Sequence, residues 1–275
     1  MTHHDRLGRA TFHSIEPRDD ISPTERDIRW FKHLERHGPL TSSHLIAWTG
    51  DTHRCKDTAL RRLQALRAAQ FLYLPKQQRK TERAEFKPYV YDLAPLGKLV
   101  LKDSGLVEET VRPTGHWWHL HETAMLTAEI DMEARSRGVR YIPAHEILQR
   151  HGATLAIPVG RQKLIPDQLF AIDYGGLFRA FMVEVDRGTE PIASSATRKS
   201  WNSALTMYAR AFQDRLPNRH YKLKAPVQVV WQHSSWARLG AFERLLAQLR
   251  SDHLRERFIV DRKCAHRTES LWRCR

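Results

Sequence analysis

The sequence predicts a mixed α/β chain, α+β overall, with a helix-rich N-terminal part followed by a mixed β-sheet with flanking helices. Apolar residues recur at helical spacing through the first third of the chain. From about residue 119 onward, the expected order is helix, strand, strand, helix, strand, helix, strand. Strands that alternate with helices form layered α/β architectures. With 275 residues, of which 41% are hydrophobic, the chain is long enough for two domains.

The charge balance favours a polyanionic partner. The formal net charge is +14, from 45 Lys and Arg against 31 Asp and Glu. No run approaches the ~18 apolar residues of a membrane span, and no basic amphipathic helix predicts membrane-surface binding. The N-terminus lacks the apolar core of a signal peptide, and three scattered cysteines suggest no disulfide framework. We therefore expect a cytoplasmic protein with no membrane partner.

The N-terminal third opens with a polar stretch, residues 1–20, which we interpret as a flexible leader. The sequence SPTE at residues 22–25 predicts a helix start, with a hydroxyl cap, a proline and an early acid, and Gly-Pro at 38–39 ends the helix. Thr41 is expected to cap a short second helix that ends near Gly50.

A third helix is predicted over residues 53–70, with Asp51-Thr52 as its cap. Two β-like runs follow, at 71–74 and 89–93, joined by the basic loop 75–88. Three short helices and a hairpin form the layout of a winged helix-turn-helix, here residues 21–105. In that module the third helix enters the DNA major groove and the hairpin tip touches the backbone. The residues predicted to bind DNA here are Thr52, His53, Arg54, Lys56, Arg61, Arg79, Lys80 and Arg83.

The second part of the chain is expected to begin after a linker. A connecting helix starts at Pro95, residues 106–118 form the linker, and a domain covers residues 119–275. Its first helix is predicted from about Leu120 to Arg137. A short β-like piece at 140–142 and a helical turn at 144–149 follow. Later elements are a helix from Lys199 to Leu216, a strand at 227–231, a helix at 237–249 and a strand at 258–260.

The most informative stretch is residues 164–190, where two β-like runs flank the Tyr-Gly-Gly turn at 174–176. Asp167 lies in the first run. Glu184 and Asp186 lie in the second and point to the same face, because strand side chains alternate. A hairpin would bring the three carboxylates together. Such a group inside an apolar sheet is costly unless a cation or catalysis compensates.

Pro166-Asp167 in one strand and Glu184-Val185-Asp186 in the next resemble the PD-(D/E)XK nuclease superfamily, which has a restriction-endonuclease-like sheet. With the winged helix in front, the string EVDRGTE at 184–190 and a following helix with lysine and tyrosine, the chain looks like the replication-relaxation family. The resemblance runs from about Thr24 to about Val260. Those proteins occur on plasmids, integrative elements and phages.

The resemblance implies a site for Mg²⁺ or Mn²⁺ that hydrolyses DNA phosphodiester bonds. Asp167, Glu184 and the carbonyl of Val185 would hold the metal, with Glu122 or Glu129 completing the site. Asp186 would be catalytic or add a carboxylate, although the nuclease pattern has lysine there. The catalytic cation would then be Lys199 or Arg198, and Arg187 would contact DNA.

Structural roles stay open for these residues. Asp167 could be a strand-start acid, Glu184 the partner of Arg187 or Lys199 in an ion pair, and Glu122 part of a solvated helix face. No zinc, Walker or dinucleotide motif is present, which disfavours a nucleotide cofactor.

Three functions are compatible with the sequence. The first is a Mg²⁺-dependent endonuclease or nickase of a mobile element or phage. The second is a non-catalytic DNA-binding accessory or regulator with a degenerate nuclease fold. The third makes the winged helix a protein-docking module. DNA is the expected partner, and either a homodimer or a replication or mobilisation complex could be formed.

Overall fold

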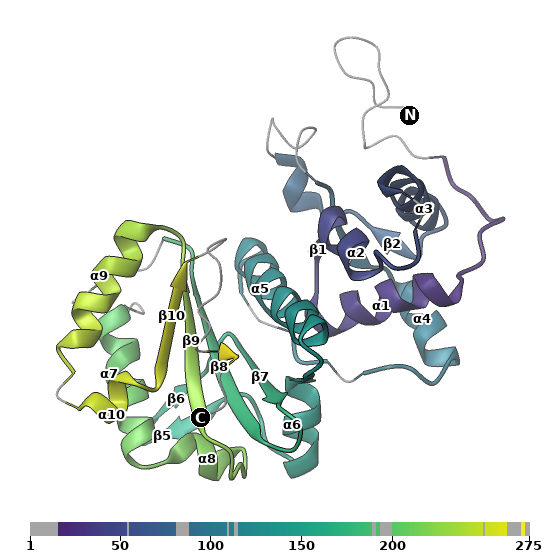
Figure 1. Cartoon of the computed structure of the whole chain (residues 1–275). Coiled ribbons are helices and arrows are strands. Elements are labelled where there is room, and N and C mark those ends of the chain that lie inside the picture. The colour runs from purple at the N-terminus through teal and green to yellow at the C-terminus, as the bar shows by residue number, and fades with distance from the viewer. Residues whose placement is uncertain are drawn as a thin grey trace. The chain divides into compact units, whose positions relative to one another are not determined.

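The computed structural model describes residues 16–53, 55–80, 88–108, 110–112, 115–188, 191–192, 200–249, 251–262 and 271–272. The chain divides into two compact units by its internal contacts (Figure 1). The first unit comprises Met1–Arg112 and Ala124–Glu129, and the second comprises Pro113–Thr123 and Ile130–Arg275. No helix in the described part of the chain is both long and apolar enough to cross a membrane.

The first unit has the topology of a winged helix-turn-helix. A three-stranded antiparallel sheet has the order β1-β3-β2, and three helices precede its hairpin. The first strand was not expected, because two residues carry no alternation pattern. The elements are α1 (Glu25–His37), β1 (Leu40–Thr41), α2 (Ser42–Trp48), α3 (Lys56–Ala68), β2 (Leu72–Tyr73), the 3₁₀ helix η1 (Lys76–Lys80), β3 (Val90–Leu93) and α4 (Pro95–Asp103).

The ends of these helices follow from local chemistry. Thr24 is the N-cap of α1 and forms a reciprocal capping box with Asp27. Thr41 caps α2 through its hydroxyl, as predicted. The predicted cap of the third helix is wrong, because α3 begins at Lys56 with Cys55 as its N-cap. The hydroxyl of Thr52 instead donates to the carbonyl of Thr49, so this residue belongs to the turn that follows α2.

Part of the predicted linker packs on the first unit. Arg36 of α1 binds Glu108 through both Nη2 and Nε, at 2.6 and 3.0 Å. Arg112 binds Asp92 of β3, with Nη1 3.0 Å from Oδ2, and also donates to the carbonyl of Leu34. These contacts tie Glu108 and Arg112 to the winged helix.

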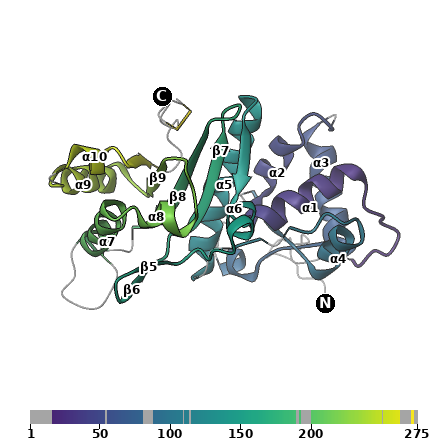
Figure 2. The same cartoon turned by 90° about the horizontal axis from the view of Figure 1, so that it is seen from below.

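The second unit contains a mixed five-stranded sheet of order β10-β9-β8-β7-β4. Strands β4, β7 and β8 pair antiparallel, whereas β8, β9 and β10 pair parallel. The strands of the second unit are β4 (Arg140–Pro143), β5 (Ile157–Val159), β6 (Gln162–Leu164), β7 (Gln168–Asp173), β8 (Phe178–Asp186), β9 (Val227–His233) and β10 (Phe258–Arg262). The β5–β6 hairpin forms a separate sheet that was not predicted (Figure 2).

Both ends of α5 (Trp117–Ser136) belong to this unit, whereas its middle, Ala124–Glu129, is grouped with the first. The other helices of this unit are α6 (Ala144–His151), α7 (Trp201–Gln213), α8 (Leu216–His220), α9 (Trp236–Ala247) and α10 (Asp252–Arg255). Helix α5 begins three residues earlier than predicted, because the side chain of His116 caps it. Helix α7 begins later than the predicted Lys199, at Trp201, where Ser200 forms a capping box with Ser203. Strand β9 extends two residues further than predicted, to His233.

An aromatic core holds α7 and α9 against the β9 side of the sheet (Figure 1). Trp231 of β9 contacts Phe242 of α9, with ring centroids 4.4 Å apart. Trp201 and Tyr208 of α7 are fully buried in the same region. These large rings fix both helices to the sheet. Side chains of α7 and α9 that reach β8 are therefore held in one position relative to that strand.

Candidate functional site

The turn at Tyr174-Gly-Gly is where β7 and β8 reverse direction, as predicted. Gln168 faces Val183 in the antiparallel register, which places Asp167 beside the C-terminal end of β8. The amide of Asp167 donates to the carbonyl of Val183 at 2.8 Å, and the amide of Val185 donates to Asp167 Oδ2 at 2.8 Å. Asp167 Oδ1 lies 2.9 Å from Nε2 of His119 on α5. The Asp167 carboxylate is therefore held from two sides.

Glu184 lies on the adjacent strand and is 3% exposed. The hydroxyl of Tyr208 on α7 donates to Glu184 Oε1 at 2.7 Å. Burial raises the pKa of Tyr208 well above its ordinary value, and the charge of Glu184, the hydrogen bond to it and the charge of Asp167 raise it further. Tyr208 therefore stays protonated at neutral pH and donates its hydrogen bond to Glu184. Asp167 and Glu184 form the centre of the candidate site.

Removing that hydroxyl should weaken the second unit. In Tyr208→Phe, Glu184 keeps its burial but loses a donor, and a hydrogen bond to a charged group contributes about 1.5–3 kcal/mol. A matched control is Tyr221→Phe, because the equally buried Tyr221 hydroxyl donates to the neutral carbonyl of Leu155 at 2.8 Å. Its loss should cost only about 1 kcal/mol. Urea unfolding of both variants measures the difference, and equal losses would contradict the assignment of a charged acceptor.

Asp186 shares the face of Glu184, as strand alternation predicts, but it has different partners. Arg238 of α9 binds both oxygens, Nε to Oδ2 at 2.5 Å and Nη2 to Oδ1 at 2.8 Å. His233 Nδ1 lies 3.5 Å from Oδ2, and the amide of Gly188 donates to Oδ1. Burial alone would raise the pKa of Asp186, but the nearby His233 ring and the bonds from Arg238 and Gly188 outweigh it and keep the pKa below its usual value.

Of the remaining predicted site residues, some have described positions in the second unit and others lie outside the described residues. Glu122 of α5 is 3.8 Å from Arg187, measured from Oε1 to Nε, and both side chains are partly exposed. Val185 is held in β8, and its amide is the donor to Asp167. Lys199 and Arg198 lie outside the described residues. Glu129 is grouped with the first unit.

Sequence reasoning missed the partners of the three acids. Tyr208 and Arg238 come from helices 24 and 52 residues beyond the acids they bind, so no local pattern signals them. The helical spacing of Tyr208 with its apolar neighbours indicates no more than a core position. His119 lies near the start of α5. Its spacing to Glu122, one helical turn, is the signal that could have placed both on one face of α5.

The predicted DNA-binding residues of the first unit differ in their surroundings. Lys56 and Arg61 are exposed on α3. Thr52 is exposed as well, whereas His53 stacks on Trp30 with ring centroids 5.1 Å apart. Burial and the charge of Arg26 lower the pKa of His53, which favours a neutral ring that packs. Arg79 and Lys80 belong to η1 and their side chains are not described, and Arg54 and Arg83 lie outside the described residues.

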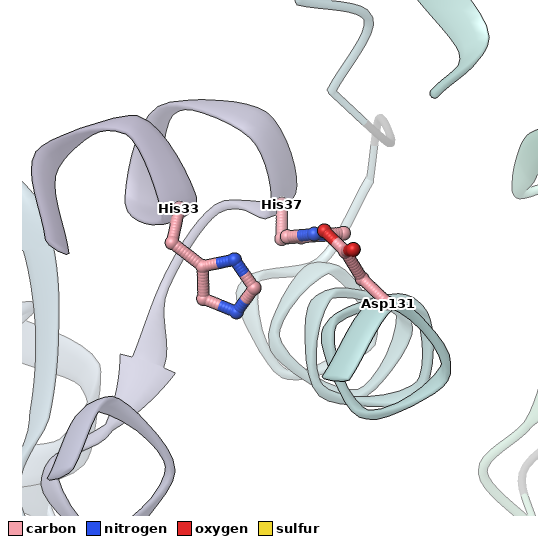
Figure 3. A group of neighbouring side chains, drawn as sticks. All are labelled: His33, His37 and Asp131. Atoms are coloured by element: carbon pink, nitrogen blue, oxygen red, sulfur yellow. The ribbon is translucent and has the colours of Figure 1, made fainter. Parts of the chain in front are cut away.

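Buried histidines form a polar part of the first unit's core. His33 and His37 lie on successive turns of α1, with ring centroids 4.6 Å apart (Figure 3). His33 also stacks on Trp48, and its Nε2 lies 3.0 Å from Nε2 of His44. Burial lowers the pKa of His37 far below its ordinary value, with help from the charge of Arg36. Asp131, also labelled in Figure 3, belongs to the second unit.

The fold defines an α+β protein of two units, with a winged helix-turn-helix topology in the first and two acids at neighbouring strand ends in the second. The family model described as replication-relaxation matches residues 31–227, from within α1 to the first residue of β9. The chain belongs to the replication-relaxation family, which indicates a DNA-related role in mobile elements. Comparison with curated proteins and with solved structures gives no significant match.

Proposed function

We propose that this chain is a DNA-binding protein of a mobile element or phage whose second unit is a Mg²⁺-dependent endonuclease or nickase. The observation that carries the proposal is the position of Asp167 beside Glu184: the amide of Val185, the residue after Glu184, donates to Asp167 Oδ2 at 2.8 Å. The two acids come from neighbouring strand ends, and the buried phenol and the Val185 amide hold them in place. Such preorganised carboxylates suit metal-assisted phosphodiester hydrolysis.

The donor set fits a hard divalent cation. The carboxylates of Asp167 and Glu184 and the carbonyl of Val185 offer oxygen ligands, which Mg²⁺ and Mn²⁺ prefer. When bound, the metal would polarise the scissile phosphate and lower the pKa of the attacking water. Tyr208 fixes the orientation of Glu184, and His119 together with the amide of Val185 fixes that of Asp167.

The charges of four further residues suggest their roles in the proposed site. Glu122 could supply a further carboxylate, and Arg187, 25% exposed beside it, suits contact with a DNA phosphate. We keep Lys199 as the catalytic cation, since the resemblance places a lysine on the helix after the second acid. Asp186 instead anchors α9 through Arg238.

The first unit would hold the DNA. Lys56 and Arg61 are exposed on the helix that enters the major groove in winged helices, and the net charge of +14 favours binding led by phosphates. We place this activity in the cytoplasm, with the chain acting as a homodimer or within a replication or mobilisation complex.

A second function, that of a non-catalytic DNA-binding accessory or regulator, is favoured by one observation. Asp186 occupies the position at which the nuclease pattern has lysine, and it is committed to a buried pair with Arg238. In this case Asp186 only holds α9 on the sheet through Arg238. The second unit would then keep its fold and the two acids Asp167 and Glu184 without cutting DNA.

A plasmid assay separates the two functions. Supercoiled plasmid should be nicked or cut with Mg²⁺ or Mn²⁺ but not with EDTA. The double variant Asp167→Asn/Glu184→Gln should lose more than the ~10–100-fold typical of residues that only support a metal ligand. Glu243→Gln is the matched control, because Glu243 is an exposed acid of α9 in the same unit.

Each other outcome contradicts one part of the proposal. If the wild type leaves the plasmid intact with either metal but retards it in a gel, the catalytic proposal is wrong and the accessory function stands. If the protein does not retard DNA at low salt, the DNA-binding proposal is wrong and the winged helix docks protein instead.

A further inference from the structure

A pocket lies at the opposite end of β8 from the acidic pair. Its cavity volume is about 460 Å³, which falls within the ~300–1,000 Å³ range of ligand sites. Ala180 in its wall precedes Glu184 by four residues, or about 13 Å along a strand. We call it the tip pocket, since the tip of the β7–β8 hairpin, helix α6 and the loop at residues 222–225 line it. It is separate from the proposed metal site.

The tip pocket combines cations with an apolar wall. Its cationic side chains are Arg140, Arg150, Lys222 and Lys224. Of the described residues that line it, Glu146 is the single acid, and Glu146 is already paired with Arg140. The wall includes Ile142, Ile147 and Ala171, and it continues into Leu177 and Phe178, which are 63% and 45% exposed. Cations around an apolar wall suit a ligand with both a planar apolar part and a phosphate.

Ordinary structural roles account for only part of this arrangement. Arg150 lies in the last turn of α6, where a basic residue is stabilised by the helix dipole. Lys222 also has a structural contact, because its Nζ donates to the carbonyl of His151 at the end of α6. Neither reason applies to Lys224, which follows α8 in a loop. Nor do these reasons account for two exposed apolar residues at the hairpin tip.

The pocket is also built from fixed parts. The carboxylate of Asp173 accepts a hydrogen bond from the amide of Gly176 at 2.6 Å, and both glycines of the turn have positive φ. On the other side, Lys222 Nζ lies 3.3 Å from the carbonyl of His151, which ties the loop to the end of α6. Such anchoring reduces the entropy lost when a ligand binds.

We propose that the tip pocket binds one nucleotide of single-stranded DNA. The base would lie against Phe178 and the apolar wall, and the phosphates would lie against Lys222 and Lys224. Single-stranded DNA fits better than duplex, because only an unpaired base can leave its neighbours and stack on a side chain. The inference builds on the DNA-related role of the chain and requires no metal, so it can fail or hold independently of the proposed cleavage.

Fluorescence anisotropy with labelled oligothymidine tests the inference on the full chain in EDTA, which prevents cleavage. Lys222→Glu/Lys224→Glu should weaken binding about tenfold at low salt, because phosphate contacts are lost. Arg161→Glu/Lys163→Glu is the matched control, since it reverses two exposed cations of the β5–β6 hairpin outside the pocket. The control should change affinity much less, and affinity for duplex DNA should be similar in both variants.

A second comparison tests the base itself. Phe178→Ala should weaken binding of oligothymidine roughly fivefold or more, as expected for a lost base–aromatic stack. The same variant should bind an abasic oligonucleotide as well as the wild type does. Equal losses for both oligonucleotides, no loss for either, or a control variant as impaired as Lys222→Glu/Lys224→Glu would overturn the proposal.

Discussion

Asp186→Ala is expected to destabilise the second unit by about 3–5 kcal/mol, the cost of leaving a buried charge without its partner. The Asp186 side chain is 0% exposed, and Arg238 is 24% exposed. Arg238 also stacks over the ring of Trp201 at 4.4 Å, so the pair joins β8, α7 and α9. Breaking it should lower the Tm of this unit by roughly 10 °C, measured by calorimetry.

The pH dependence of this loss has a definite sign. Because the pKa of Asp186 is lowered in the folded chain, its stabilisation is present above the ordinary carboxyl pKa of ~3.9 and is lost as the pH falls through the folded pKa. The difference in stability between wild type and Asp186→Ala should therefore shrink in acid. A difference that stays constant from neutral pH to below the ordinary carboxyl pKa would contradict the role of a charged Asp186.

This pair also bears on catalysis. A lysine in place of Asp186 would set an ammonium group against the guanidinium of Arg238, and two like charges in a buried site repel strongly. The chain therefore tolerates no lysine at this position while Arg238 is present. If the second unit cuts DNA, its catalytic cation must come from another element, such as the segment that carries Lys199.

Strand periodicity allowed the centre of the candidate site to be predicted. The alternation of Val183, Glu184, Val185 and Asp186 placed both acids on one face, and the glycine turn placed Asp167 beside them. Both predictions concern residues that are separated by no more than about 20 positions in the sequence. Their partners could not be predicted, because Tyr208 and Arg238 reach them only after α7 and α9 pack on the sheet.

The fold shows the same limit. Long amphipathic helices and β7, β8 and β9 were predicted because their apolar patterns are extended. Strand β1 has two residues and depends on pairing with β3, and the β5–β6 hairpin has three residues in each strand. Such short elements are stabilised by tertiary contacts rather than by their own sequence. The cap of α3 was misplaced because the turn after α2 uses the hydroxyl of Thr52.

Asp27→Ala should destabilise the first unit by a similar amount, about 3–5 kcal/mol. Asp27 is fully buried, and its carboxylate accepts bonds from the amide and hydroxyl of Thr24 at 2.7 and 2.8 Å. Arg62 of α3 binds it with Nη2 2.6 Å from Oδ2, and the same nitrogen donates to the carbonyl of Ser22. One carboxylate therefore caps α1 and fastens α3 to it.

The control for this prediction is Glu25→Ala, which removes an exposed acid from the same helical turn and should cost less than about 1 kcal/mol. A double-mutant cycle of Asp27→Ala and Arg62→Ala should show strong coupling, and additive losses would contradict the pair. Neutralising the exposed Lys56 and Arg61 should instead leave the unfolding free energy within about 0.5 kcal/mol. Arg62 on α3 therefore has a structural role, whereas Lys56 and Arg61 on the same helix are exposed to solvent.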